Sequence, residues 1–310
     1  MKITTKLRER FCRDCNIPIK IFHEPYFTDR LELLDDMYGT IDKWNLFLQE
    51  NKYNNEQDYF EEYNRVKDEA INSIKSSEAY QRFNEEDINQ YNIKNTGLSN
   101  HDIFHPDNDG KIFISVDMKK ANFSSLQHYD DTMFACAPTW EDFIGLFTSN
   151  KHIIQSKYIR QVILGNCNPR RHITYEKYLM DGVLDLLADS FISKNRVVFF
   201  SNDEIVFDVT DDVFARDRAE LLQWVLDKKA EIPLKVELFV LHKIGGIDGY
   251  YKEIYKENGE KEIELKCVDN YMMPFVIRKL KGEEITDSDK VFYHEGLLAQ
   301  FIEMPEINLD

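Results

Sequence analysis

The sequence predicts an α+β protein, in which a helical N-terminal region is followed by an antiparallel sheet with helices on one side. The first hundred residues carry apolar side chains at three- and four-residue spacing among many charges, which is typical of amphipathic helices. After a turn-rich segment at 101–110 (HDIFHPDNDG), short β-branched apolar runs alternate with turns, which is typical of strands. We therefore expect a helical region over 1–110 and a second region over 111–310.

In the N-terminal region, helices are predicted over Leu31–Glu50 and Gln57–Phe83, separated by the polar turn Asn51–Asn55. Ahead of them, Cys12 and Cys15 have the spacing of zinc ligands. No second pair of this kind follows to complete four ligands, so we do not expect a structural zinc site.

The second region begins with an apolar strand over 111–116 that ends at Asp117. Helices are then predicted over 152–164 and 175–193, followed by two strands over 196–200 and 205–209 with a tight turn between them. The remaining elements are a helix over 216–229 and strands over 235–242, 250–255 and 262–268.

Composition sets limits on location. No window approaches eighteen uninterrupted apolar residues, which argues against a membrane span, and the first residues lack the apolar stretch of a signal peptide. A cytoplasmic location is therefore expected, with the five cysteines as free thiols.

Charge is unevenly distributed along the chain. The net charge is −17, which is unusual for a nucleic-acid-binding protein because phosphate binding relies on clustered Lys and Arg. Between Lys151 and Tyr175, however, there is no acidic residue and several basic ones. This basic segment is either a local anion site or the solvated face of a helix.

Carboxylates occur at the ends of two apolar strands. Asp117 ends the first strand, and Asp203 and Glu204 occupy the turn between two others. If these strands are neighbours, the three carboxylates converge and can hold Mg²⁺, which prefers a few carboxylates together with substrate phosphates. The alternative is that Asn202, Asp203 and Glu204 only form a hairpin turn, for which Asn and Asp are common.

The basic segment supplies a phosphate-binding element. On a helix over 152–164, Lys157, Arg160, Gln161 and Leu164 fall on one face, and Gly165 allows close approach of a ligand. Cations in this arrangement would neutralise charge on a triphosphate leaving group. The alternative is a surface helix with two solvated cations.

Three segments resemble the motifs of a known family. Ser201–Asp208 (SNDEIVFD) resembles motif C of the family A DNA polymerases, a His-Asp-Glu turn between strands, with Asn202 in place of histidine. Asp117, at the end of a strand and before a helix, resembles motif A. Lys157–Gly165 resembles motif B, in which a lysine precedes a Tyr-Gly pair. The motifs follow in the order A, B, C, and the resemblance covers about residues 111–210.

The chain also departs from that family. Asn122 stands where motif A has a glutamate that selects against ribose, Ile153 replaces an arginine of motif B, and Leu164 replaces the tyrosine. The segment after Asp117 is also similar to motif A of reverse transcriptases, and the Ser-x-Asp-Glu turn is similar to the palm of tRNA-His guanylyltransferases.

The resemblance implies a palm-like sheet with an insertion of fingers-like helices over about 150–195. It implies that Asp117 and Asp203 ligate two Mg²⁺ (or Mn²⁺) ions and that Glu204 assists them as a ligand or from beside the metals. It also implies that Lys157 contacts the β- or γ-phosphate, with Arg160 beside it.

Further roles are implied around this centre. Gln161, Gly165 and Asn122 belong to the implied substrate-binding set. Arg170 and Arg171 are candidates for contacts with template or primer phosphates, and Lys279 is a candidate for a primer contact.

These expectations support a template-directed polymerase that uses nucleoside triphosphates and a DNA or RNA primer-template. A second hypothesis is a palm enzyme without a template, such as a nucleotide cyclase or a terminal nucleotide transferase. A third is an inactive palm that acts as an interaction module of a replication complex. The acidic surface favours this third reading, and it also predicts a protein partner that compensates for the charge. The Lys-, Asn-, Ile- and Tyr-rich composition is typical of an AT-rich genome, such as that of a bacteriophage, a large virus or a low-GC bacterium.

Overall fold

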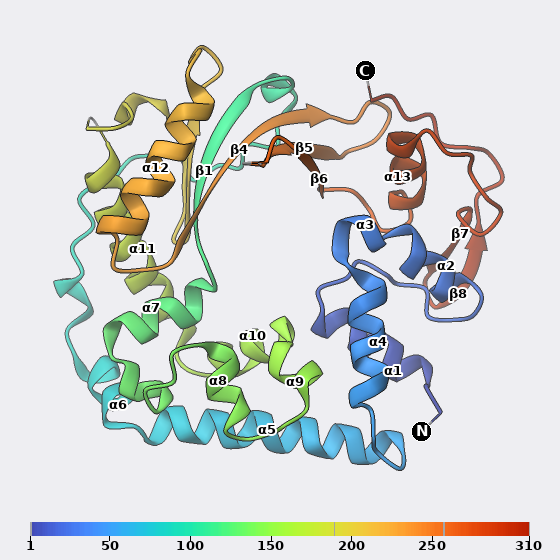
Figure 1. Cartoon of the computed structure of the whole chain (residues 1–310), viewed down its shortest axis with the longest axis horizontal. Coiled ribbons are helices and arrows are strands. Elements are labelled where there is room, and N and C mark those ends of the chain that lie inside the picture. The colour runs from blue at the N-terminus through green and yellow to red at the C-terminus, as the bar shows by residue number, and fades with distance from the viewer. Residues whose placement is uncertain (1, 189, 257, 310) are drawn as a thin grey trace.

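The fold, described from a computed structural model that covers residues 2–188, 190–256 and 258–309, is α+β as predicted. Figure 1 shows the N-terminal helices on one side of the molecule and the sheet with its covering helices on the other. The helices before the sheet are α1 (Thr5–Asp14), α2 (Tyr26–Leu33), α3 (Asp35–Tyr38), α4 (Thr40–Glu50), α5 (Glu56–Ser76) and α6 (Glu78–Glu85), followed by the 3₁₀ turns η1 (Ile88–Gln90) and η2 (Pro106–Asn108).

The central sheet is antiparallel throughout, with strand order β2-β3-β1-β4-β5-β6. Its strands are β1 (Ile112–Met118), β2 (Val197–Phe200), β3 (Glu204–Asp208), β4 (Leu234–Lys243), β5 (Tyr250–Tyr255) and β6 (Lys261–Lys266). The strands predicted before and after the turn at 201–204 are confirmed as β2 and β3. Strand β3 is the neighbour of β1, and β2 lies on the other side of β3.

A helical segment is inserted between β1 and β2. It contains α7 (Ala121–Tyr129), η3 (Asp131–Phe134), α8 (Trp140–Gly145), α9 (Lys151–Gln155), α10 (Lys157–Gly165), α11 (Pro169–Leu187) and η4 (Lys194–Arg196). The helix predicted over 152–164 is divided at Ser156, whose side chain caps α10 by accepting a hydrogen bond from the Ile159 amide. The helix predicted over 175–193 begins earlier, at Pro169, and ends at Leu187; Asp189 of that range lies outside the described residues.

Helix α12 (Ala215–Lys229) lies between β3 and β4 in the sequence. After β6 come α13 (Met273–Lys281), β7 (Val291–His294) and β8 (Leu297–Gln300). One face of the sheet is covered by α11 and α12, whose apolar side chains share a core with Ile114, Val116 and Met118 of β1 (Figure 1). The helices on one side of the sheet are therefore as predicted. The opposite face has a smaller core around Phe113 and Phe239.

The largest core crosses the predicted boundary at residue 110. It joins apolar side chains of α1 to α6 with those of α7 to α11 and with the C-terminal segment around α13. The helices before residue 110 therefore do not have a hydrophobic core of their own. Within the described residues, no helix is long and apolar enough to cross a membrane.

Candidate active site

The predicted carboxylates meet at one end of β1. This strand lies antiparallel to β3, and Asp117 is directly opposite Glu204 in the register. Directly opposite residues of neighbouring strands project from the same face of a sheet. The Met118 amide also donates a hydrogen bond of 2.8 Å to the Asp203 carbonyl, which fixes the turn against the end of β1.

The turn between β2 and β3 is held from within. Ser201 Oγ accepts hydrogen bonds from the backbone amides of Asp203 (3.3 Å) and Glu204 (3.0 Å). The same hydroxyl donates a hydrogen bond of 3.0 Å to Asp203 Oδ1. These are the local side-chain bonds that favour Ser and Asp in turns. The segment therefore does form a hairpin turn, and it carries its two acids in a fixed position.

Helix α11 holds the same turn from outside. Lys177 Nζ donates to the carbonyls of Phe200 (2.8 Å) and Ser201 (3.0 Å). One residue earlier on α11, the Glu176 carboxylate accepts a hydrogen bond of 2.6 Å from the side-chain amide of Asn202. Glu176 is only 4% exposed, so a fourth carboxylate lies beside Asp203, withdrawn from solvent.

Burial, with repulsion from neighbouring acids, raises the pKa values of Asp117, Glu176 and Glu204. Burial raises the pKa of Asp117 to about 7, and repulsion from Glu204 and Asp203 adds to the effect. Burial also raises the pKa of Glu176 to about 7, where the Asn202 hydrogen bond opposes the shift and Asp203 reinforces it. For Glu204 burial again raises the pKa, although Lys252 and Lys266 counteract it. The negative charge at this end of the sheet is thus only partly balanced by the chain.

A cavity of about 510 Å³ lies in front of these acids. Its lining contains seven of the residues predicted from the sequence, drawn from three distant segments: Asp117, Asn122, Lys157, Arg160, Gln161, Gly165 and Asp203. Glu204 faces Asp117 in the sheet but is not part of the lining. The acids therefore form one wall of the cavity, and the basic face of α10 forms another.

Two buried polar atoms of the lining residues have no partner among the described residues. These are Arg160 Nε, a donor, and His172 Nε2 on α11. Burial also lowers the pKa of Arg160, although Glu141 opposes the shift. Buried polar atoms are normally satisfied, and these two exceptions belong to residues that line the cavity.

The structure does not bring all the predicted residues together. Arg171 is 9% exposed, its guanidinium stacks over the Phe83 ring at 5.3 Å, and it donates to the Glu86 carbonyl. The expectation that Arg171 contacts nucleic acid is therefore corrected, because this side chain is committed to the core. Its neighbour Arg170 is exposed at the start of α11. Lys279 lies on α13, where Nζ donates to the Ile307 carbonyl, and it lines a different cavity.

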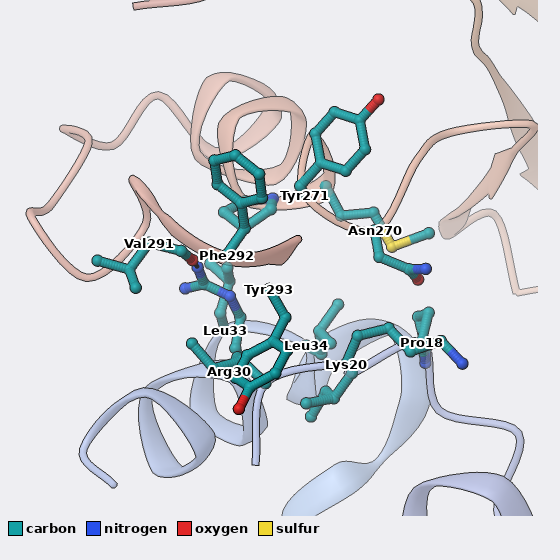
Figure 2. A pocket seen from close by; sticks show the side chains of 14 residues that line it. Pro18, Lys20, Arg30, Leu33, Leu34, Asn270, Tyr271, Val291, Phe292 and Tyr293 are labelled. Atoms are coloured by element: carbon teal, nitrogen blue, oxygen red, sulfur yellow. Dashed lines mark hydrogen bonds between the residues drawn. The ribbon is translucent and has the colours of Figure 1, made fainter. Parts of the chain in front are cut away.

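A smaller apolar cavity of about 100 Å³ lies where the N-terminal helices meet α13 and β7, as Figure 2 shows. The one arginine in its lining, Arg30, is fully engaged: it pairs with Asp289 at 3.2 Å and donates to three backbone carbonyls. Arg30 is therefore not available to bind a charged ligand in this cavity, whose lining also includes Lys20.

Most of the lining residues that sequence reasoning missed lie on α11, and Lys120 and Ala121 lie at the start of α7. His172 and Glu176 are one helical turn apart and both line the cavity. Pro169 at the first helical position is a sequence signal for a helix start that would have placed both residues on α11.

Comparison of the chain with protein-family models, with curated proteins and with solved structures gave no significant match in any of the three searches.

Proposed function

We propose that the protein is a nucleic-acid polymerase that transfers nucleotides by two-metal-ion catalysis at the cavity between β1, α10 and α11. The observation that carries this proposal is the shared cavity lining of Asp117, Asp203 and the basic residues of α10. Acids on one wall and cations on the other are what a metal-bound triphosphate requires.

The donor set suits magnesium or manganese better than a softer metal. Within the described residues, no group of three or more His, Cys, Asp or Glu side chains is arranged to hold a metal ion without help. Mg²⁺ is commonly bound by one or two carboxylates together with substrate phosphates, and Asp117 and Asp203 supply two. Burial and repulsion from Glu204 and Asp203 raise the pKa of Asp117, and a divalent cation would relieve that repulsion.

The chain's own residues would then divide the work. Asp117 and Asp203 would hold the ions, which when bound lower the pKa of an attacking hydroxyl and stabilise charge on the leaving pyrophosphate. Lys157, at the first turn of α10, and Arg160, one turn on, would bind the β- and γ-phosphates. Lys177 and Ser201 would keep Asp203 in position through the bonds that hold the turn.

A path for a nucleic-acid strand is suggested by a second cavity of about 490 Å³ next to the first. Gln161 lines both cavities, and the second lining includes Arg13, Lys20 and Tyr158. Cations together with an aromatic ring are the elements that bind single strands.

Enzymes that need no template remain the second candidate, favoured by one observation. The net charge of −17 opposes binding to an extended nucleic acid without a basic partner protein. Product analysis separates the two candidates: a template-directed enzyme makes products whose sequence follows the template, and a cyclase or terminal transferase does not.

The test of the proposal is extension of a labelled primer on DNA and RNA templates with Mg²⁺ or Mn²⁺. Asp203→Asn keeps the shape of the side chain and the Ser201 contact but removes a charge, so we expect it to reduce extension at least about 100-fold. Asp208→Asn is the matched control, because Asp208 lies at the end of β3 away from the turn that holds Asp203, and its carboxylate accepts hydrogen bonds from Thr210. Equal extension by wild type and Asp203→Asn would refute the proposal.

A further inference from the structure

Helix α12 exposes apolar side chains on its outer side. The helix packs on the sheet through its opposite side, where Leu222 and Val225 are buried in the core (Figure 1). On the outer side Leu221 is 43% exposed and Trp224 is 59% exposed, and Phe214, just before the helix, is 63% exposed. Residues 214, 221 and 224 are spaced by seven and three, so they fall on one face. Exposed tryptophan and other large apolar side chains that adjoin one another are typical of protein interaction surfaces.

Two charges without a partner lie on the same outer face. Asp217 and Lys228 are both exposed on α12. In the part of the chain that the structure describes, neither side chain has a hydrogen bond or an ion pair with another residue. The other acids on this face have partners within the helix: Arg216 for Glu220 at 3.5 Å, and Gln223 for Asp227 at 2.8 Å. One acid and one base are therefore available to pair with another molecule.

The apolar and charged side chains of this face are placed symmetrically along α12. Leu221 and Trp224 lie equally far from the midpoint between residues 222 and 223, and so do Asp217 and Lys228. If two copies of α12 meet antiparallel at this midpoint, Leu221 of each packs on Trp224 of the other. Asp217 of each then lies opposite Lys228 of the other, about 16 Å along the helix. A twofold axis produces this kind of interface, in which each contact occurs twice.

We infer that α12 is a self-association surface, on which a second copy of the chain docks its own α12 in the antiparallel arrangement. A basic partner protein would attract Asp217 and repel Lys228, and an acidic partner would do the reverse. A second copy pairs both charges at once. The net charge of −17 opposes association, but salt screens charges that lie more than about 8 Å apart at physiological ionic strength. Among the described residues, none from α12 lines the cavity in front of Asp117 and Asp203, so this surface is separate from the candidate active site.

The test is sedimentation equilibrium of the full chain at physiological salt, over a concentration series from about 1 to about 500 µM. Contact between two single helices is small, so we expect a dimer with a dissociation constant on the order of 10–100 µM. Trp224→Ala should weaken self-association at least about 10-fold, because the dimer loses this side chain from both copies. Trp224 is mostly exposed, so the same variant should unfold in urea at the wild-type concentration.

Charge exchange tests the antiparallel arrangement itself. Asp217→Lys and Lys228→Asp each place like charges opposite one another at both ends of the helix pair, and each should weaken self-association about 5- to 30-fold. An equimolar mixture of the two variants should form a heterodimer about as tightly as wild type forms its dimer. The double variant Asp217→Lys/Lys228→Asp, which keeps the wild-type net charge, should also recover wild-type affinity. Lys151→Asp is the control, because it makes the same charge change at an exposed position at the start of α9 and should leave self-association unchanged.

Three results would overturn the inference. Wild-type protein that stays monomeric over the whole concentration series would leave the outer face of α12 to a different protein. A dimer that Trp224→Ala does not weaken would have its interface elsewhere. A mixture of Asp217→Lys and Lys228→Asp that associates no more tightly than either variant alone would show that these two charges do not face each other.

Discussion

Two groups of buried carboxylates in this protein have opposite surroundings. Asp14, at the end of α1, is fully buried and surrounded by donors: Tyr63 OH and Ser156 Oγ each at 3.0 Å, with His152 Nε2 at 3.2 Å. Asp117, Glu204 and Glu176 lie instead around Asp203. Burial raises the pKa values of these three acids, and repulsion from Asp203 adds to the shift. Asp14 is surrounded by donors, whereas in the second group Asp203 and Glu176 accept one side-chain hydrogen bond each, from Ser201 and Asn202.

The difference separates a structural role from a ligand-binding role. Asp14 joins α1 to α5 and to the residue that caps α10, so its charge is used to hold three helices together. Acids at a cavity whose charges are not balanced destabilise the folded protein, and binding of a cation restores the lost stability. The two groups also cooperate, since Asp14 fixes the start of the helix that presents Lys157 to the cavity.

The largest effect is expected at Asp14. Asp14→Ala leaves the buried donors of Tyr63, Ser156 and His152 without an acceptor, and we expect it to lower the free energy of unfolding by about 3–5 kcal/mol. Asp117→Asn, by contrast, should leave stability unchanged or raise it, because it removes a repelled charge. Urea denaturation of both variants measures the difference, and a large loss in Asp117→Asn would contradict the comparison.

The pH dependence of stability follows from the same contrast. In the unfolded chain Asp117 and Glu176 ionise near pH 4, whereas the folded protein holds their protons until about pH 7. Without divalent ions, the free energy of unfolding should therefore fall as pH rises from about 4 to 7, by on the order of 3 kcal/mol for each of the two carboxyls. Wild type and Asp117→Asn, compared by urea denaturation at each pH, should differ in this slope; parallel curves would count against the raised pKa.

Phosphate binding by α10 gives a smaller effect. Lys157→Ala should weaken Mg²⁺-triphosphate binding about 10- to 150-fold, because it removes a charge-assisted hydrogen bond. Lys151→Ala is the control, since Lys151 is exposed at the start of α9 and does not line the cavity. Titration calorimetry measures the affinity of each variant for the Mg²⁺-triphosphate. Equal affinities would mean that α10 does not bind the phosphates.

The smallest effect distinguishes two adjacent arginines. Arg171→Ala should lower the free energy of unfolding by about 1–3 kcal/mol, because it removes the Phe83 contact and the bond to the Glu86 carbonyl. Arg170→Ala, at an exposed position, should change it by less than about 0.5 kcal/mol. Thermal unfolding checks both, and equal losses would mean that Arg171 is not held in the core.

The sequence predicted the fold class and about half of the cavity lining because those features are local. A strand that ends in Asp117, a turn at Asp203 and a basic helical face at Lys157 can each be recognised from a short window. The partners of Asp14 could not be, because Tyr63 and Ser156 lie 49 and 142 residues away. The sequence also could not show that Arg171 is buried and Arg170 exposed, because this depends on which face of α11 packs against the core.

The most direct test of the account is Mn²⁺ binding, followed by electron paramagnetic resonance, with a non-hydrolysable nucleoside triphosphate present. We predict that wild-type protein binds Mn²⁺ more tightly than the free nucleotide does, and that Asp117→Asn and Asp203→Asn lose this added affinity while Asp208→Asn keeps it. Mn²⁺ affinity equal to that of the free nucleotide in wild type, or unchanged in both variants, would contradict the claim that these acids form a metal-nucleotide site.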